Sequence, residues 1–301
     1  MTQATPLAAS ANLRSIYAML CAVALFSVMD TCMKLLSATY PAMQVAALRA
    51  LTSLPLVLAY VGWRGGFGSM LQVRWSMHLM RGVLGIAMLS LFAFGIQTLS
   101  LAEAYSIFFI APALITALSV VFLKETVNRA RWAAIVVGLA GVLVVLRPSG
   151  AGMLTLGGLA ILGAAAMYAV SAISARILSR TDRSEHMVLW LMVFVAVGAS
   201  ILAAPGWVGV RHGDAALLCG LAVSGFLGQL AITEAFGYGE ASKVAPFEYT
   251  ALAFGVGFDW LLWNTLPDRF TMLGAAIIIG SGLYLIRHEG GQAGLPEAEH
   301  P

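Results

Sequence analysis

Charged residues are scarce in this chain of 301 residues. Asp, Glu, Lys and Arg make up 10% of it, hydrophobic residues make up 60%, and the mean hydropathy is +0.89. Soluble domains are about a quarter charged and roughly half apolar. So little charge excludes a surface that water alone solvates, and it predicts a protein of the lipid bilayer. The net charge of +3 is small and its basic residues are dispersed, so no nucleic-acid surface is predicted.

Cysteine is also rare, with only Cys21, Cys32 and Cys219, each inside an apolar stretch. Neither a CxxC pair nor a Cys/His spacing typical of metal ligands occurs. We therefore predict small residues buried either in lipid or within the helix bundle at these positions, and neither a metal site nor a cofactor.

Sequence motifs of enzymes and ATP-driven pumps are missing as well. The chain has no GxxxxGK[ST] loop, no HExxH and no GxSxG. Its five histidines fall in loops or at the ends of apolar stretches. An intramembrane enzyme is therefore not expected, although it stays an alternative class. A channel is a further alternative, but no charged ring or filter motif supports it.

Long apolar stretches fill most of the chain. A membrane-spanning helix needs roughly 20 mostly apolar residues. Ten stretches meet or approach this length, and the short loops between them leave no room for a soluble domain. The first stretch follows no basic run or cleavage site, so we expect it to be retained. The expected spans are 15–36, 42–63, 78–98, 102–123, 131–147, 154–176, 186–204, 214–236, 241–263 and 270–287.

The Lys and Arg residues are distributed unequally between the two ends of these spans. With a cytoplasmic N-terminus, 12 of the 17 would be cytoplasmic, four would be external and Arg49 would lie inside a span. The positive-inside rule then places both termini in the cytoplasm of a multi-pass inner-membrane protein. The tail 288–301 is rich in Gly, Glu and Pro, and we expect it to be disordered. The 12 are Arg14, Arg64, Arg74, Arg81, Lys124, Arg129, Arg131, Arg176, Arg180, Arg183, Lys243 and Arg287.

An internal repeat divides the spans into two sets. Residues 25–37 match residues 167–179, so that Phe26 meets Tyr168 and Lys34 meets Arg176, and a second stretch near 97–104 matches 234–241. Each half has five spans, an odd number, so the second half must begin on the opposite side of the membrane. Inverted repeats of this kind are typical of secondary transporters, whose substrate site lies between the halves near the midplane.

Residues 101–148 contain four recognisable motifs: the run Leu101 to Pro112, Leu123-Lys-Glu125, the glycine-containing stretch that begins at Arg131, and Leu146-Arg-Pro148. Together these motifs resemble the EamA domain of the drug/metabolite transporter superfamily. Leu48-Arg-Ala50 and Leu79-Met-Arg-Gly82 also resemble that family. The similarity extends over two repeats, 15–148 and 154–287. It implies an all-α fold with a central cavity surrounded by the first four helices of each half.

The resemblance also implies a function. Similar proteins export amino acids and related metabolites without ATP, as aromatic amino acid exporters of the YddG type do. Other branches carry riboflavin, S-adenosylmethionine, nucleotide sugars or triose phosphates, so import of another metabolite is an alternative. The second half departs from the family pattern at Glu248-Tyr249 and at Trp263-Asn264. The substrate therefore stays open.

Polar side chains at membrane depth usually face a cavity or a partner. Asp30 and Arg49 lie about 9 and 10 Å from the outer ends of their spans. They form either a structural ion pair or a clamp for a zwitterion, and Lys34 is the alternative partner for Asp30. Glu248 lies about 12 Å into its span. It is either a proton-coupling carboxylate or one hydrogen-bonded to a neighbouring helix.

Aromatic side chains offer stacking surface for an amphipathic solute. Phe26 and Tyr168 are equivalent in the repeat, and Phe92 is the repeat partner of the central Gln229. The alternative for each aromatic residue is core packing or lipid contact. The predicted substrate-binding residues are Phe26, Asp30, Arg49, Phe92, Tyr105, Phe109, Tyr168, Gln229 and Glu248.

Glycine and proline mark two further features. Glycines in spans 131–147 and 270–287 permit close helix approach, either within the chain or in a homodimer through these two spans. They are Gly138, Gly141, Gly274, Gly280 and Gly282. Pro112 and Pro246 each remove a backbone hydrogen bond, and we expect a bend at both, either static or serving as a hinge.

Overall fold

The computed structural model describes residues 6–95, 98–99, 101–147, 155–263 and 268–293, and within these ranges every regular element is helical. Nine helical stretches in this described part are long and apolar enough to cross a membrane. The main helices are α1 (Pro6–Leu36), α2 (Ala42–Trp63), α3 (Trp75–Gly95), α4 (Leu101–Phe108), α5 (Ala111–Leu118), α6 (Arg129–Leu146), α7 (Leu156–Leu178), α8 (Ser184–Ala203), α9 (Ala215–Tyr238), α10 (Ala241–Val244), α11 (Thr250–Trp263) and α12 (Arg269–Ala293).

Two of the expected spans are interrupted helices. The span expected at 102–123 consists of α4, α5 and the π-helical turn η2 (Ser119–Leu123). Pro112 lacks an N–H group, so it cannot bond to the carbonyl of Phe108, where α4 ends. The span expected at 241–263 consists of α10, the 3₁₀ turn η5 (Ala245–Tyr249) and α11. Pro246 lies in this turn, so both prolines accompany breaks rather than simple bends.

The C-terminal prediction was partly wrong. Residues 288–293, assigned to a disordered tail, continue α12 as far as Ala293. Gly290 and Gly291 are poor helix formers, but the next proline after them is Pro296, so nothing blocks the helix before Ala293. Residues 294–301 lie outside the described part of the chain.

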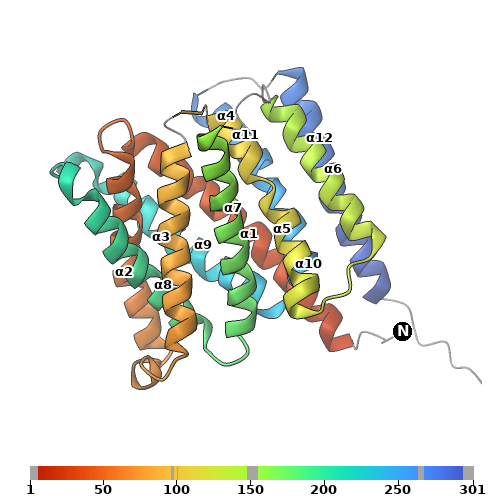
Figure 1. Cartoon of the computed structure of the whole chain (residues 1–301), viewed down its shortest axis with the longest axis horizontal. Coiled ribbons are helices and arrows are strands. Elements are labelled where there is room, and N and C mark those ends of the chain that lie inside the picture. The colour runs from red at the N-terminus through yellow and green to blue at the C-terminus, as the bar shows by residue number, and fades with distance from the viewer. Residues whose placement is uncertain (1–5, 96–97, 100, 148–154, 264–267, 294–301) are drawn as a thin grey trace, which may run out of the picture.

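Helices from the two halves pack against each other in pairs. The most extensive contacts join α1 to α9, α2 to α8, α3 to α7 and α6 to α12, and Figure 1 shows α6 and α12 side by side at one edge. Glycines permit this approach. A Cβ atom on Gly274 would lie 2.6 Å from the carbonyl oxygen of Gly141, and one on Gly228 would lie 2.8 Å from the ring of Phe26.

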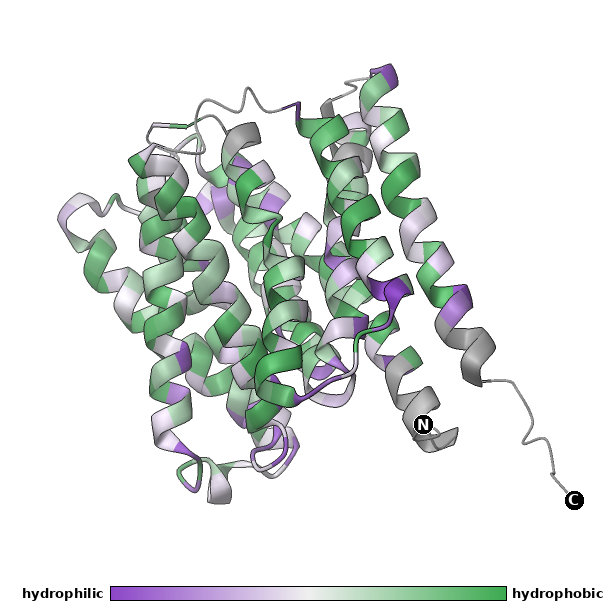
Figure 2. Cartoon of the chain, turned by 45° about the vertical axis from the view of Figure 1, so that its right-hand side comes forward, coloured by the Kyte–Doolittle hydropathy of each residue, from purple (hydrophilic) through white to green (hydrophobic). Residues whose placement is uncertain are grey.

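Polar contacts join the two halves at both ends of the bundle. We call the end at which α1 begins the basic end, because it carries Arg64, Arg74, Lys124, Arg129, Arg180 and Lys243. Figure 2 shows hydrophilic residues in its loops. There His78 Nε2 lies 2.8 Å from Asp182 Oδ2. At the opposite end, the Tyr40 hydroxyl donates to Asp214 Oδ2 at 2.6 Å.

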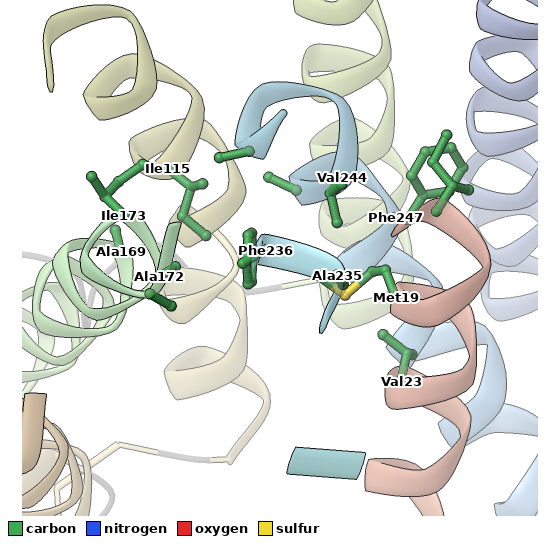
Figure 3. Close-up of a cluster of buried hydrophobic side chains, with 14 of the residues drawn as sticks. Met19, Val23, Ile115, Ala169, Ala172, Ile173, Ala235, Phe236, Val244 and Phe247 are labelled. Carbon is green, nitrogen blue, oxygen red and sulfur yellow. The ribbon is translucent and has the colours of Figure 1, made fainter. Parts of the chain in front are cut away.

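The largest hydrophobic core lies in the half of the molecule nearer the basic end. It gathers side chains mainly from α1, α5, α7, α9, α10 and η5, with one buried side chain each from α6, α8 and α12. In Figure 3, Phe236 lies between Ile115 and Ile173 on one side and Met19 on the other. Met19 and Phe236 also line the central cavity, so this core forms the cavity's apolar floor.

Candidate functional site

A cavity of about 320 Å³ lies between the two halves. Its lining comes from α1, α2, α3, α4 with the adjoining Phe109, α7, α8, α9, η5 and α11. These elements belong to the eight spans that the resemblance placed around a central cavity. No lining residue in the described part of the chain comes from α6 or α12.

Eight of the nine predicted binding residues lie in this lining. The exception is Phe92, which packs behind it, with its ring centroid 5.8 Å from that of Tyr105 and 5.6 Å from that of Phe108. Phe92 therefore supports the wall. Substrate binding by the eight lining residues stays a prediction. They are Phe26, Asp30, Arg49, Tyr105, Phe109, Tyr168, Gln229 and Glu248.

Asp30 and Arg49 enter the cavity from α1 and α2. Their charges interact electrostatically, but no ion pair within 4.0 Å joins these two described residues. The Arg49 guanidinium instead lies over the ring of Phe26, with Cζ 5.6 Å from the centroid. The guanidinium is held by the face of an aromatic ring, and the Asp30 carboxylate is near it without forming an ion pair. Both charged groups are therefore available to a ligand.

Glu248 lies on the other half of the cavity wall. The hydroxyl of Tyr168 donates a hydrogen bond to Glu248 Oε1 at 2.9 Å. This corresponds to one of the two predicted roles of Glu248, a carboxylate bonded to a neighbouring helix. The two repeat-related aromatic residues thus contact charges of opposite sign, Phe26 a guanidinium and Tyr168 a carboxylate.

Aromatic rings cover the wall between these charges. Tyr105, Phe108 and Phe109 follow one another at the broken end of α4. The ring of Phe108 lies 5.8 Å from that of Tyr168, and the ring of Tyr105 lies 6.5 Å from that of Phe109. A solute here would meet apolar ring surface between polar groups, the usual composition of a small-molecule site.

Among the charged residues of the described lining, Arg81 is the one that the sequence prediction missed. It was counted as a basic residue near the cytoplasmic ends of the spans and as part of the Leu79-Met-Arg-Gly82 match, but not as a binding residue. In the structure α3 begins at Trp75, so Arg81 lies inside the helix, lines the cavity and is 4% exposed. The signal was present, because three residues of the expected span 78–98 precede it. Positional uncertainty at span ends hid it.

A polar network joins the halves at the basic end. The Glu125 carboxylate accepts the backbone N–H groups of Ala241 and Ser242, each at 2.9 Å. Arg131 Nη1 lies 2.9 Å from Glu240 Oε2. Glu125 comes from the Leu-Lys-Glu motif, and its partners begin α10. In the second half, the position that corresponds to this motif is Trp263-Asn264, near the end of α11, and Asn264 lies outside the described residues.

The described residues include no group of three or more His, Cys, Asp or Glu side chains that could hold a metal ion. Elsewhere in the described loops, Asp182 is partly buried, which raises its pKa. Hydrogen bonds from His78, Thr181 and the Arg74 backbone outweigh this and hold the pKa of Asp182 below its ordinary value.

Comparison with known proteins gives a consistent result. The sequence model of the EamA-like transporter family matches residues 13–147 and 155–287. The pseudopaline exporter of Pseudomonas aeruginosa is 27% identical over 270 residues, covering 88% of this chain and 93% of the exporter. The riboflavin transporter of Vibrio cholerae is 28% identical over 252 residues, covering 83% and 84% of the two chains.

Two further similarities extend over most of the chain. The S-adenosylmethionine uptake transporter of Rickettsia conorii is 26% identical over 260 residues, covering 86% of this chain and 88% of the transporter. A solved crystal structure matches with a TM-score of 0.79 at 17% identity, covering 94% of this chain and 98% of that one. At this identity the solved structure bears on the fold alone.

Proposed function

Because this chain belongs to the EamA-like transporter family of the drug/metabolite transporter superfamily, we propose that it is a secondary exporter of amino acids or related zwitterionic metabolites. Its named relatives are membrane transporters, which points away from catalysis, and they include both an exporter and importers. Similarity to the YddG type stays an expectation of the sequence.

The observation that carries the proposal is the presence of both charge signs in one cavity. Arg49 offers a guanidinium to a carboxylate, and Asp30, within its electrostatic reach, offers a carboxylate to an ammonium group. An α-amino acid carries both groups on one carbon. The rings of Phe26, Tyr105 and Tyr168 would pack against the apolar part of the solute.

We further propose ten spans arranged as two inverted five-helix repeats, with residues 241–263 forming the tenth through α10, η5 and α11. The packing pairs support this. In the repeat, α1, α2 and α3 correspond to α7, α8 and α9. The contact of α1 with α9 therefore corresponds to that of α7 with α3, and the contact of α2 with α9 to that of α8 with α3. All four contacts are present. Alternating access would follow from rocking of the halves around the cavity.

The proposed location is the inner membrane, with the basic end and both termini in the cytoplasm. The excess of Lys and Arg at that end supports this orientation. The proposed homodimer through α6 and α12 has weaker support. Gly141 and Gly274 already contact each other within the chain, and Gly280 has open space beside it. Light scattering of the purified protein would give the stoichiometry.

We propose Glu248 as the proton-coupling group. A carboxylate among apolar walls can take up a proton, and the bond from Tyr168 gives it a fixed position. Glu248→Gln should abolish accumulation driven by a pH gradient and leave exchange intact, as measured in proteoliposomes. Gradient-driven accumulation that survives this change would show that Glu248 is not required for coupling.

A second candidate function is uptake of a ring-bearing metabolite of the riboflavin or S-adenosylmethionine class. The aromatic wall favours it, and relatives of both names are similar to this chain. A ligand screen by thermal unfolding separates the two functions, because a ligand that binds only the folded state raises the melting temperature. We expect amino acids to raise it. Stabilisation by flavin or adenosine compounds alone would favour the second candidate.

A further inference from the structure

Arg81 is a buried cation, and two of its three side-chain nitrogens lack hydrogen-bond partners. Its side chain lines the cavity, only 4% of the residue is exposed, and both Nε and Nη1 are buried with no hydrogen-bond partner. Burying a charged group without a partner is strongly unfavourable. A structure that keeps such a group is missing a counter-charge.

Two acidic residues at the basic end, Asp182 and Glu185, already have other partners. Asp182 accepts from His78, from Thr181 and from the backbone of Arg74. Glu185 pairs with Arg183 at 2.6 Å. Among the described residues no carboxylate lies within 4.0 Å of the Arg81 guanidinium. Its positive charge interacts electrostatically with His78, one helical turn away, which is not a counter-charge.

The surroundings of Arg81 within the cavity wall are apolar. Leu84 and Met88 follow it on α3, and Leu191 and Val195 of α8 lie opposite Gly85, one turn further along α3. A Cβ atom on the adjacent Gly82 would lie 2.6 Å from Phe194, so α3 and α8 are in close contact here. This packing leaves the cavity as the direction from which a counter-charge can come.

Arg49 and Arg81 lie at different depths of the same cavity. Arg49 is seven residues from the start of α2 at one end, and Arg81 is six residues from the start of α3 at the other. At 1.5 Å per residue, the two positions are separated by roughly 10 Å along the bundle axis. Both are long side chains, so one extended solute can contact both guanidinium groups.

We propose that Arg81 binds a second acidic group of the substrate, so that the preferred substrates are zwitterions with two acidic groups rather than monocarboxylic amino acids. Arg49 and Asp30 would hold the α-carboxylate and the ammonium group, and Arg81 would take a side-chain carboxylate or phosphate in its planar fork. This proposal rests on the proposed function, because it assumes a zwitterion bound at Arg49.

Equilibrium dialysis of the purified full chain with matched ligand pairs tests it. One pair is glutamate and glutamine, and the other is O-phosphoserine and serine. We expect the wild-type protein to bind at least one acidic member about tenfold more tightly than its neutral partner. Which pair shows the preference distinguishes a carboxylate from a phosphate. Equal affinities within both pairs would overturn the proposal.

Variants place the preference at Arg81. Arg81→Gln should reduce the acidic-to-neutral affinity ratio to about one and change binding of the neutral member less than threefold. Arg129→Gln, at an exposed position on α6, is the matched control and should keep the ratio. A preference that persists in a folded Arg81→Gln protein would contradict the proposal.

If Arg81→Gln does not fold, Arg81→Lys decides the question. It keeps the buried charge but loses the two-pronged geometry, so the ratio should fall several-fold, and an unchanged ratio would overturn the proposal. The amino acid function and the role of Arg81 would be contradicted by different results. If none of the four ligands binds the wild-type protein but other amino acids move in counterflow, the role of Arg81 fails, and if no amino acid moves, the amino acid function fails. If the four ligands bind without an acidic preference, only the role of Arg81 fails.

Discussion

Asp30, Arg49 and Glu248 are charged residues placed among predominantly apolar helices, where charge is unfavourable unless it has a use or a partner. None of their repeat counterparts is charged, since Ala172, Leu191 and Ala111 occupy the equivalent positions. The sequence could therefore single them out as departures from the symmetry. All three line one cavity.

The Arg49 side chain is the residue whose loss should affect binding most. Arg49→Gln removes both the charge that meets a carboxylate and the stacking on Phe26. Truncating one side of a desolvated charge pair typically costs about 2–5 kcal/mol, so affinity should fall at least about 30-fold. Equilibrium binding to the purified protein measures this.

Arg269→Gln is a suitable control for Arg49, because Arg269 is exposed at the start of α12 and does not line the cavity. Its affinity should match that of the wild-type protein. An Arg49→Gln protein that folds and binds normally would remove Arg49 from the site.

The Asp182 carboxylate gives a pH-dependent prediction. Its pKa is lower in the folded protein than in the unfolded chain, so its ionised form stabilises the fold. That contribution is present above about pH 4 and is lost as the pH falls through the folded pKa. Asp182→Asn should reduce the free energy of unfolding by about 1–2 kcal/mol at pH 7.

Denaturant titration in detergent at pH 7 and at about pH 3 checks this prediction for Asp182. The difference between wild type and variant should shrink at the lower pH, because Asp182 is then partly protonated in both folded and unfolded states. A difference of equal size at both values would mean that the carboxylate's charge has no part in stability.

At the scale of elements, the two broken spans place site residues that a continuous helix would place elsewhere. Phe109 lies in the gap between α4 and α5, and Glu248 lies in η5. The sequence predicted distortion from Pro112 and Pro246, but it could not give the form of the break. The geometry of each break depends on which backbone N–H and C=O groups form hydrogen bonds outside the helix.

Glu125 joins the first half to the second at such a break. Its carboxylate accepts two N–H groups at the start of α10, and the amide of Glu125→Gln has only one oxygen to replace both. We expect hydrogen exchange of the Ala241 and Ser242 amides to become about tenfold faster, because one hydrogen bond of roughly 1–1.5 kcal/mol is lost.

Mass spectrometry of a peptide covering residues 241–244 would measure this exchange. Arg129→Gln serves again as a nearby exposed control and should leave the rate unchanged. If exchange in the Glu125→Gln protein equals that of wild type, the contact does not hold the halves together at the basic end.

At the scale of the whole molecule, hydropathy predicted where the nine long apolar helices of the described residues lie, because hydropathy is a property of single segments. The bounds of α2 agree with the expected span 42–63. Helix partners could not be predicted this way, because pairs such as Gly141 with Gly274 depend on the shape of both surfaces. For the same reason Phe92 was assigned to the lining rather than behind it, whereas Arg81 was missed because it lies near the end of a predicted span.

The central claim is that one cavity carries a zwitterionic solute across the membrane without ATP. Counterflow in proteoliposomes tests it most directly, with a labelled amino acid panel outside and unlabelled solute inside. We predict uptake of at least one zwitterion by wild-type protein without ATP, and about tenfold lower affinity when Phe26 and Tyr168 are both changed to Ala. If no amino acid moves, or if the double variant transports with unchanged affinity, the account of this site is contradicted.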